Sequence, residues 1–181
     1  MNITGLFLLP GLSIYIATRS HLLYENFTYV GNQSAYRPIF LTWGILLSMH
    51  MLVTFIALLK ITHNQHASYI LLVSILGILH GISYVLPYNK DTSLLASELH
   101  VYISIATFIG YILLLLLYMY RLHNFYLFIT TVKAMITLLV AMFFSLMLTG
   151  DISSVVELIN TNYMSIFMLY LLKKTKRYQY G

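Results

Sequence analysis

The stretch SELHVYISIATFIGYILLLLLYM, residues 97–119, decides the fold, because after Glu98 it contains no Asp, Glu, Lys or Arg. A helix rises about 1.5 Å per residue, so about 20 mostly apolar residues cross the hydrocarbon core of a bilayer, which is about 30 Å thick. Five other segments are similarly apolar, and residues 1–181 are therefore predicted to form a single all-α membrane domain, a bundle of six transmembrane helices. The predicted spans cover approximately residues 3–18, 38–60, 67–86, 97–119, 125–149 and 153–172.

The composition of the 181 residues excludes most other classes of protein. Hydrophobic residues make up 60% of the chain and charged residues 8%, which excludes an ordinary soluble domain and a disordered chain. The apolar runs are continuous rather than alternating, which argues against a β-barrel. Cysteine is absent, so disulfides and thiolate chemistry are excluded.

The net charge of +5 does not indicate a nucleic-acid partner, because four of the ten basic residues lie in the last nine positions. A basic tail after an apolar span is typical of membrane topology and of contact with anionic lipids. Six predicted spans place both termini on one side, together with Lys60, Arg121 and the tail. Arg19, Arg37 and Lys90 fall on the other side. The positive-inside rule then predicts cytoplasmic termini, in a bacterial cell membrane or, as the alternative, an organellar inner membrane.

Charged residues gather at the predicted outer side. Glu98 and His100 open the fourth span, Glu157 lies about one turn inside the sixth, and Arg37 precedes the second. Charges near a bilayer are costly unless they are paired or hydrated. One interpretation is a polar pocket for a lipid head group or small polar ligand. The other is a set of interface groups facing water, with one structural pair, Arg37–Glu98 or Arg37–Glu157.

Two patterns concern the helix faces. Polar residues recur on one face of the fourth span, which predicts either helix packing or one wall of a polar cavity that descends from the outer side. These residues are Ser97, His100, Ser104, Thr107, Tyr111 and Tyr118. In the third span, Gly77 and Gly81 form a GxxxG pattern, which predicts a close contact between two helices of the bundle.

The histidines do not predict a cofactor. His50 and His80 lie within spans and could suggest a haem with two axial histidines, but they lie about 18 and about 10 Å below the outer edge, which fits poorly. His63 and His66 form an H-x-x-H pair in a loop with no third ligand nearby. We therefore predict neither a haem nor a metal site.

The order of several short motifs resembles a known family. Tyr29-Val30-Gly31-Asn32 ends the first loop, Pro87 follows the third span, and Glu98-Leu99-His100 opens the fourth. This order resembles the DRAM–Frag–Sfk superfamily of six-helix membrane proteins, and in particular its bacterial members. The resemblance implies six helices with cytoplasmic termini. Eukaryotic relatives are associated with autophagy, lipid-anchor remodelling and plasma-membrane lipid organisation, and the resemblance supplies no catalytic residues.

Three functions remain open from the sequence. The first is a non-enzymatic protein whose outer pocket takes a membrane lipid or amphiphile, or supports a partner protein. Gly31 would then shape the loop, Arg37 and His100 would contact an anionic head group, and Glu98 and Glu157 would orient these cations. The second is a lipid-modifying enzyme with His100 as general base, oriented by Glu98 or Glu157. The third is a small subunit of a larger respiratory or transport complex.

Overall fold

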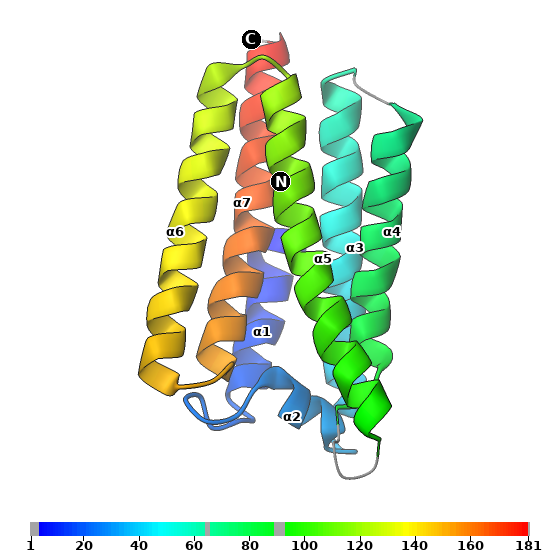
Figure 1. Ribbon diagram of the computed structural model, residues 1–181, viewed down its shortest axis with the longest axis vertical. Coiled ribbons are helices and arrows are strands. Elements are labelled where there is room, and N and C mark those ends of the chain that lie inside the picture. Colours follow the sequence, from blue (N-terminus) through cyan, green and yellow to red (C-terminus); the bar gives the residue numbers. More distant parts are fainter. Residues whose placement is uncertain (1–3, 64–65, 89–92, 181) are drawn as a thin grey trace.

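The computed structural model describes residues 4–63, 66–88 and 93–180, and this part of the chain is helical, with no strand. Figure 1 shows the helices as a bundle. The elements in chain order are a π-helical turn η1 (Thr4–Leu8), α1 (Leu9–Ala17), α2 (Phe27–Asn32), α3 (Arg37–Ile61), α4 (Ala67–Val85), α5 (Leu94–Arg121), α6 (Phe125–Thr149) and α7 (Ser154–Tyr180).

Within the described residues, the five helices α3 to α7 are long and apolar enough to cross a bilayer. Large apolar side chains on their outer faces are exposed, among them Leu95, Phe144 and Leu148. A soluble protein rarely exposes apolar surface on this scale, whereas lipid tails solvate it readily. The fold therefore agrees with an integral, multi-pass membrane protein.

The first predicted span, residues 3–18, is not a full-length helix. The apolar segment Gly5–Ala17 is shorter than the five others and measures only about 20 Å at about 1.5 Å per residue. Its start lies beside the middle of α3 and α7, where the Ser165 hydroxyl donates to the carbonyl oxygen of Gly5 at 3.1 Å. The sixth full span is therefore not confirmed, because this segment occupies only half of the bundle length.

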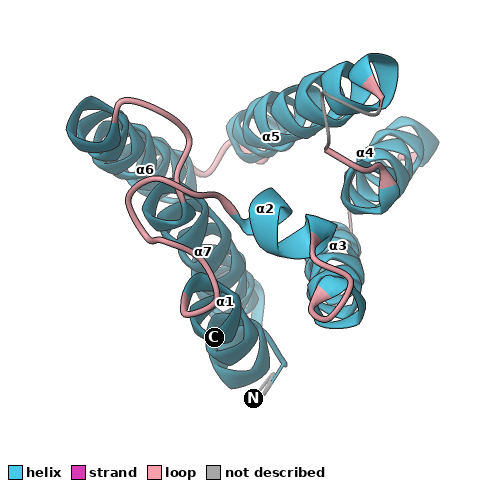
Figure 2. Ribbon diagram, turned by 90° about the horizontal axis from the view of Figure 1, so that it is seen from below, coloured by secondary structure: helices cyan, strands magenta, loops and turns pink. Residues whose placement is uncertain are grey.

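The five long helices form a ring in chain order, which the contact between α3 and α7 closes. Helix α3 packs against α4 and α7, α4 against α5, and α6 against α5 and α7, while α1 contacts α3 and α7. Seen along the bundle, the short helix α2 lies across the ring (Figure 2). We call this the α2 end, and the opposite one the C-terminal end. Helices α5 and α6 meet at the C-terminal end and diverge towards the α2 end (Figure 1).

Local sequence explains where several helices begin and end. The side chains of Asn26 and Asn124 cap α2 and α6, accepting from the third residue beyond at 2.9 and 3.0 Å. Pro38 lies in the first turn of α3, where its missing N–H is not needed. Gly150 ends α6 with a φ of 75°, a conformation that other residues rarely adopt.

The helix bounds sort the charges as the sequence predicted. Lys60, Arg121 and the four tail bases lie at the C-terminal end, and Glu25, Glu98 and Asp151 lie at the α2 end. Lys90, which the sequence predicted on the same side as Arg19 and Arg37, is outside the described residues.

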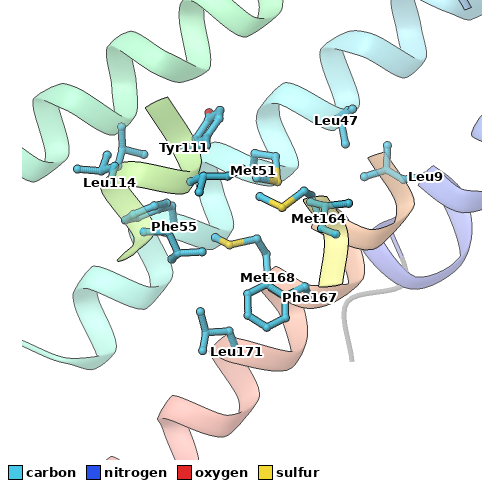
Figure 3. Close-up of a cluster of buried hydrophobic side chains, with 14 of the residues drawn as sticks. Leu9, Leu47, Met51, Phe55, Tyr111, Leu114, Met164, Phe167, Met168 and Leu171 are labelled. Carbon is cyan, nitrogen blue, oxygen red and sulfur yellow. The ribbon is translucent and has the colours of Figure 1, made fainter. Parts of the chain in front are cut away.

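Buried apolar side chains fill the bundle from mid-length towards the C-terminal end. Figure 3 shows side chains of α3, α5 and α7 converging there, with Met51, Met164 and Met168 in the middle of the cluster. Phe55 and Leu171 are fully enclosed. We call this group the apolar floor, because it bounds the cavity described next.

Candidate binding cavity

A cavity of about 120 Å³ lies in the half of the bundle nearer the α2 end, between α3, α4, α5 and α7, with α2 at its margin. A water molecule needs about 10–15 Å³ of such space, so the cavity is large enough for several waters or a small chemical group. It is lined by Thr28, Trp43, Leu47, Met51, His80, Tyr84, His100, Ser104, Phe108, Tyr111, Glu157, Asn160, Thr161 and Met164.

Glu157 supplies the only carboxylate among the described residues that line the cavity. It lies in the first turn of α7, and its carboxylate accepts a hydrogen bond from the backbone N–H of Phe27, the first residue of α2. The beginning of a helix carries partial positive charge, which stabilises an anion there. The carboxylate is thus held by a helix N-terminus and not by a basic side chain.

Gly31 allows α2 to lie close enough for this contact. A Cβ at Gly31 would fall 2.5 Å from Cδ1 of Phe40 on α3, which is a severe clash. Only glycine therefore lets α2 approach α3 here. This position of α2 allows the Phe27 N–H to hydrogen-bond to Glu157 and the Thr28 hydroxyl to hydrogen-bond to His100.

Both histidines of the cavity are fully engaged by neighbouring groups. The Nδ1 of His100 lies 2.6 Å from the carbonyl oxygen of Ser83, which can only accept, so this nitrogen carries the proton. The Nε2 of His100 then accepts from the Thr28 hydroxyl at 3.3 Å. A neutral His100 satisfies both contacts.

The same reasoning assigns the proton on His80. The Ser48 hydroxyl donates its one proton to the carbonyl oxygen of Gly44 at 2.9 Å, so it must accept from Nδ1 of His80 at 3.2 Å. The Nε2 of His80 then accepts from the Tyr84 hydroxyl at 3.0 Å. His80 is therefore also neutral in this arrangement.

Two polar atoms of the lining have no hydrogen-bond partner among the described residues. They are the hydroxyl of Tyr111, whose side chain is only 3% exposed, and the Oδ1 atom of Asn160. Asn160 follows Glu157 by three residues, which places both side chains on one face of α7. Buried polar groups in proteins are almost always hydrogen-bonded, so these two atoms indicate a missing partner.

Aromatic rings form much of the wall. Trp43 packs edge-on against Phe27 and Tyr84, with ring centroids 5.1 and 5.2 Å apart. Its indole N–H donates to the Ser13 hydroxyl of α1 at 2.9 Å. Gly44 leaves room for Tyr84 to lie against α3, because a Cβ at this position would overlap the Tyr84 ring.

The structure brings together two of the five residues that the sequence assigned to a ligand site. His100 and Glu157 line the cavity, and Gly31 acts from α2 without lining it. Arg37 donates instead to the carbonyl oxygen of Val85 at 3.3 Å, and the side chain of Glu98 is exposed. In residues 4–63, 66–88 and 93–180, Arg37 forms an ion pair with neither Glu98 nor Glu157.

The polar face of α5 accounts for part of the wall. His100, Ser104 and Tyr111 line the cavity, whereas Thr107 and Tyr118 are buried in helix contacts away from it. The sequence left packing and cavity wall as alternatives for this face, and the structure contains both. Asn160 was not singled out as a site residue, although its spacing from Glu157 was a usable signal.

The remaining sequence motifs lie elsewhere. His50 contacts the carbonyl oxygen of Ser165 at 3.3 Å, and of the haem pair only His80 lines the cavity. Gly77 and Gly81 face α3: a Cβ at Gly77 would lie 3.2 Å from Leu52, and one at Gly81 would lie 4.0 Å from Ser48. The His63 and His66 side chains are exposed at the C-terminal end, and residues 64–65 between them are outside the described residues.

Comparison with protein-family models, with curated proteins and with solved structures finds no match for this chain. What the cavity does is therefore argued from its own geometry and chemistry.

Proposed function

We propose that this chain is a multi-pass membrane protein that binds the polar group of a lipid or another amphiphile in the cavity between α3, α4, α5 and α7. The observation that carries the proposal is a pair of polar atoms, Tyr111 Oη and Asn160 Oδ1, that have no partner among the described residues and lie in a cavity that also holds Glu157. Leaving a buried polar atom unpaired costs about 1–3 kcal/mol, which a bound polar group offsets.

Two features favour binding over conduction and catalysis. The apolar floor separates the cavity from the C-terminal end of the bundle. The polar cavity is therefore confined to the half of the bundle nearer the α2 end. The enzyme alternative requires His100 as a general base, but Thr28 and Ser83 engage both of its ring nitrogens. Glu98, one of its two proposed partners, is exposed.

The proposed orientation places the cavity towards the outer leaflet. Six helical segments would lie in the bilayer, with Gly5–Ala17 covering half its depth from the outer side, and the basic end of α7 would face the cytoplasm. Lys174 supports this placement at an interface, because it contacts the hydroxyls of Tyr126 and Tyr170 at 2.6 and 2.5 Å. The resemblance to the DRAM–Frag–Sfk superfamily and a role in lipid organisation are in keeping with this proposal.

Native mass spectrometry of the chain in mild detergent tests the proposal. We expect an amphiphile of defined mass to remain bound. Ser104→Leu fills the cavity with a larger apolar side chain and should abolish this mass, whereas Ala106→Leu on the exposed face of α5 should retain it. A chain that carries no amphiphile, or equal occupancy in both variants, would count against the proposal. A stoichiometric partner protein in place of the amphiphile would support the alternative, a subunit of a larger complex.

A further inference from the structure

The described lining of the cavity contains an acidic side chain but no basic one that balances it. Glu157 is acidic, both histidines are satisfied as neutral rings, and no Lys or Arg is among the described residues of the lining. Arg37 is held at Val85, and Arg19 lies over the rings of Tyr15 and Tyr36, 4.9 and 5.6 Å from their centroids. A carboxylate at this depth is costly without a cation nearby, and the described residues provide none there.

Most hydrogen-bond donors of the lining are already used within the chain. The Thr28 and Tyr84 hydroxyls donate to His100 and His80, as described above. The Thr161 hydroxyl donates to the carbonyl oxygen of Glu157 at 2.8 Å, and the Trp43 indole donates to Ser13. These four side chains offer a bound molecule no further proton.

Several hydrogen-bond acceptors of the lining remain unused among the described residues. The Glu157 carboxylate accepts from Phe27 but has capacity for several more hydrogen bonds, and Oδ1 of Asn160 accepts none from the described residues. The oxygen of Tyr111 also has no partner among them. The hydroxyls of Tyr111 and Ser104 and the amide N–H groups of Asn160 can also donate, but the only charged group among the described residues of the lining is a carboxylate, which repels a phosphate or a carboxylate and accepts from a cationic donor.

The walls suit a cation as well. The rings of Trp43, Tyr84, Phe108 and Tyr111 line the cavity, and aromatic faces attract an ammonium group. The volume of about 120 Å³ is below the roughly 150 Å³ of a cavity that holds one benzene molecule, so only a small group fits.

From the charge, the donors and the walls we infer that the cavity binds a protonated primary amine. Its three N–H groups match the three acceptors of Glu157, Asn160 and Tyr111, whereas a quaternary ammonium could donate to none of them. The inference rests on the proposed function and names its ligand class. It also replaces the anionic head group expected from the sequence, because Arg37 does not reach the cavity. The amine is carried either by a lipid head group or by a free amphiphile.

Trp43 provides the measurement, because it is the only tryptophan of the chain and lines the cavity. The full chain, in nanodiscs of phosphatidylcholine, is titrated with octylamine at neutral pH and, separately, with octanol, while Trp43 emission is recorded. We expect saturable binding of octylamine with a Kd at least about tenfold lower than that of octanol, as charge-assisted hydrogen bonds warrant. Replacing phosphatidylcholine by phosphatidylethanolamine separates the sources: competition with octylamine identifies the lipid head group, and no competition identifies a free amine.

Glu157→Gln should remove the preference for octylamine. Glutamine keeps a carbonyl oxygen for the Phe27 N–H, so α2 stays seated. Asp151→Asn is the matched control, because it neutralises an exposed carboxylate at the same end and should keep the preference. Should Glu157→Gln fail to fold, Asn160→Leu removes an acceptor that makes no bond among the described residues, and it should weaken octylamine binding.

The outcomes separate the two proposals. Equal affinity for octanol and octylamine, or an amine preference that survives in Glu157→Gln, overturns the amine inference and leaves amphiphile binding standing. Loss of all saturable signal, together with the absence of any bound mass in the spectrometer, overturns both.

Discussion

At the scale of the residue, two tyrosines of α5 differ in whether their buried hydroxyls are hydrogen-bonded. The Tyr118 hydroxyl contacts the Thr62 hydroxyl and lies 3.5 Å from the carbonyl oxygen of Leu58, so it is paired within the chain. The Tyr111 hydroxyl, seven residues earlier on the same face, has no partner among the described residues. The first serves the fold, and the second is available to a ligand.

Tyr111→Phe should therefore separate binding from stability. The substitution removes only a hydroxyl that is unpaired among the described residues, so we expect the free energy of unfolding to stay unchanged or to rise, while ligand occupancy falls about fivefold or more. Thermal unfolding in detergent and native mass spectrometry measure the two quantities.

Tyr118→Phe is the control and should behave in the opposite way. It removes a hydrogen bond worth about 0.5–1.5 kcal/mol and should leave ligand occupancy intact. If Tyr111→Phe destabilised the chain as much as Tyr118→Phe and left occupancy unchanged, the cavity would have no role for its hydroxyl.

The sequence could place polar residues at one end of the bundle, but it could not say which of them meet. Glu157 and His100 are candidate site residues from the sequence because ionisable side chains within a membrane span are costly unless they are paired or hydrated. Arg37 and Glu98, which the sequence placed in the same candidate site, do not line the cavity. The directions of the Arg37 and Glu98 side chains depend on how the residues before α3 and α5 fold, and helical periodicity does not predict this.

At the scale of the element, α2 is the feature that the sequence missed. Residues 19–37 lie between the first two predicted spans, and FTYVGN has β-branched residues and a glycine, which are poor helix formers. The helix forms because Asn26 caps it and because Phe27 and Val30 are buried under the bundle. Tertiary packing therefore overrides local propensity in this segment.

Gly31→Ala tests whether the position of α2 depends on its close contact with α3. The new methyl group would clash with the Phe40 ring, so α2 must shift, at a cost of about 1–3 kcal/mol. Because Phe27 packs on Trp43, the shift should also change Trp43 emission. Chemical unfolding and fluorescence measure both effects.

Gly11→Ala is the matched control for this substitution. A Cβ at Gly11 meets nothing within 4 Å, and alanine favours a helix over glycine by up to about 1 kcal/mol. We expect equal or greater stability and unchanged emission. The same loss in both variants would show that α2 is not held by close contact at Gly31.

At the scale of the whole molecule, the sequence predicted α3 to α6 to within a few residues, whereas α7 (Ser154–Tyr180) extends eight residues beyond the predicted end at 172. The predicted 38–60 and 125–149 are α3 (Arg37–Ile61) and α6 (Phe125–Thr149). These bounds were accessible because a bilayer demands a fixed apolar length. That the first segment, Gly5–Ala17, covers only half of the bundle length was harder to predict from the sequence, because it depends on where η1 contacts α3 and α7.

The sorting of charges predicts which end faces outwards. The chain has no cysteine, so single cysteines can be introduced cleanly at Ser34, near the α2 end, and at Lys176, in the basic tail; both side chains are exposed. A membrane-impermeant maleimide added to whole cells should label Ser34→Cys and not Lys176→Cys until the cells are opened. The reverse pattern would invert the proposed orientation and place the cavity in the cytoplasmic leaflet.

The apolar floor has an electrical consequence. A transmembrane voltage falls mainly across the part of a protein that excludes water and ions, and here this part is the stretch from Met51 and Met164 to the C-terminal end. A unit charge crossing the full field exchanges about 2.3 kcal/mol per 100 mV with it. A charge resting beside Glu157, about one turn inside α7, has crossed little of that field. On the proposed function, we therefore expect occupancy of the cavity to be insensitive to membrane potential and to follow the composition of the adjoining leaflet.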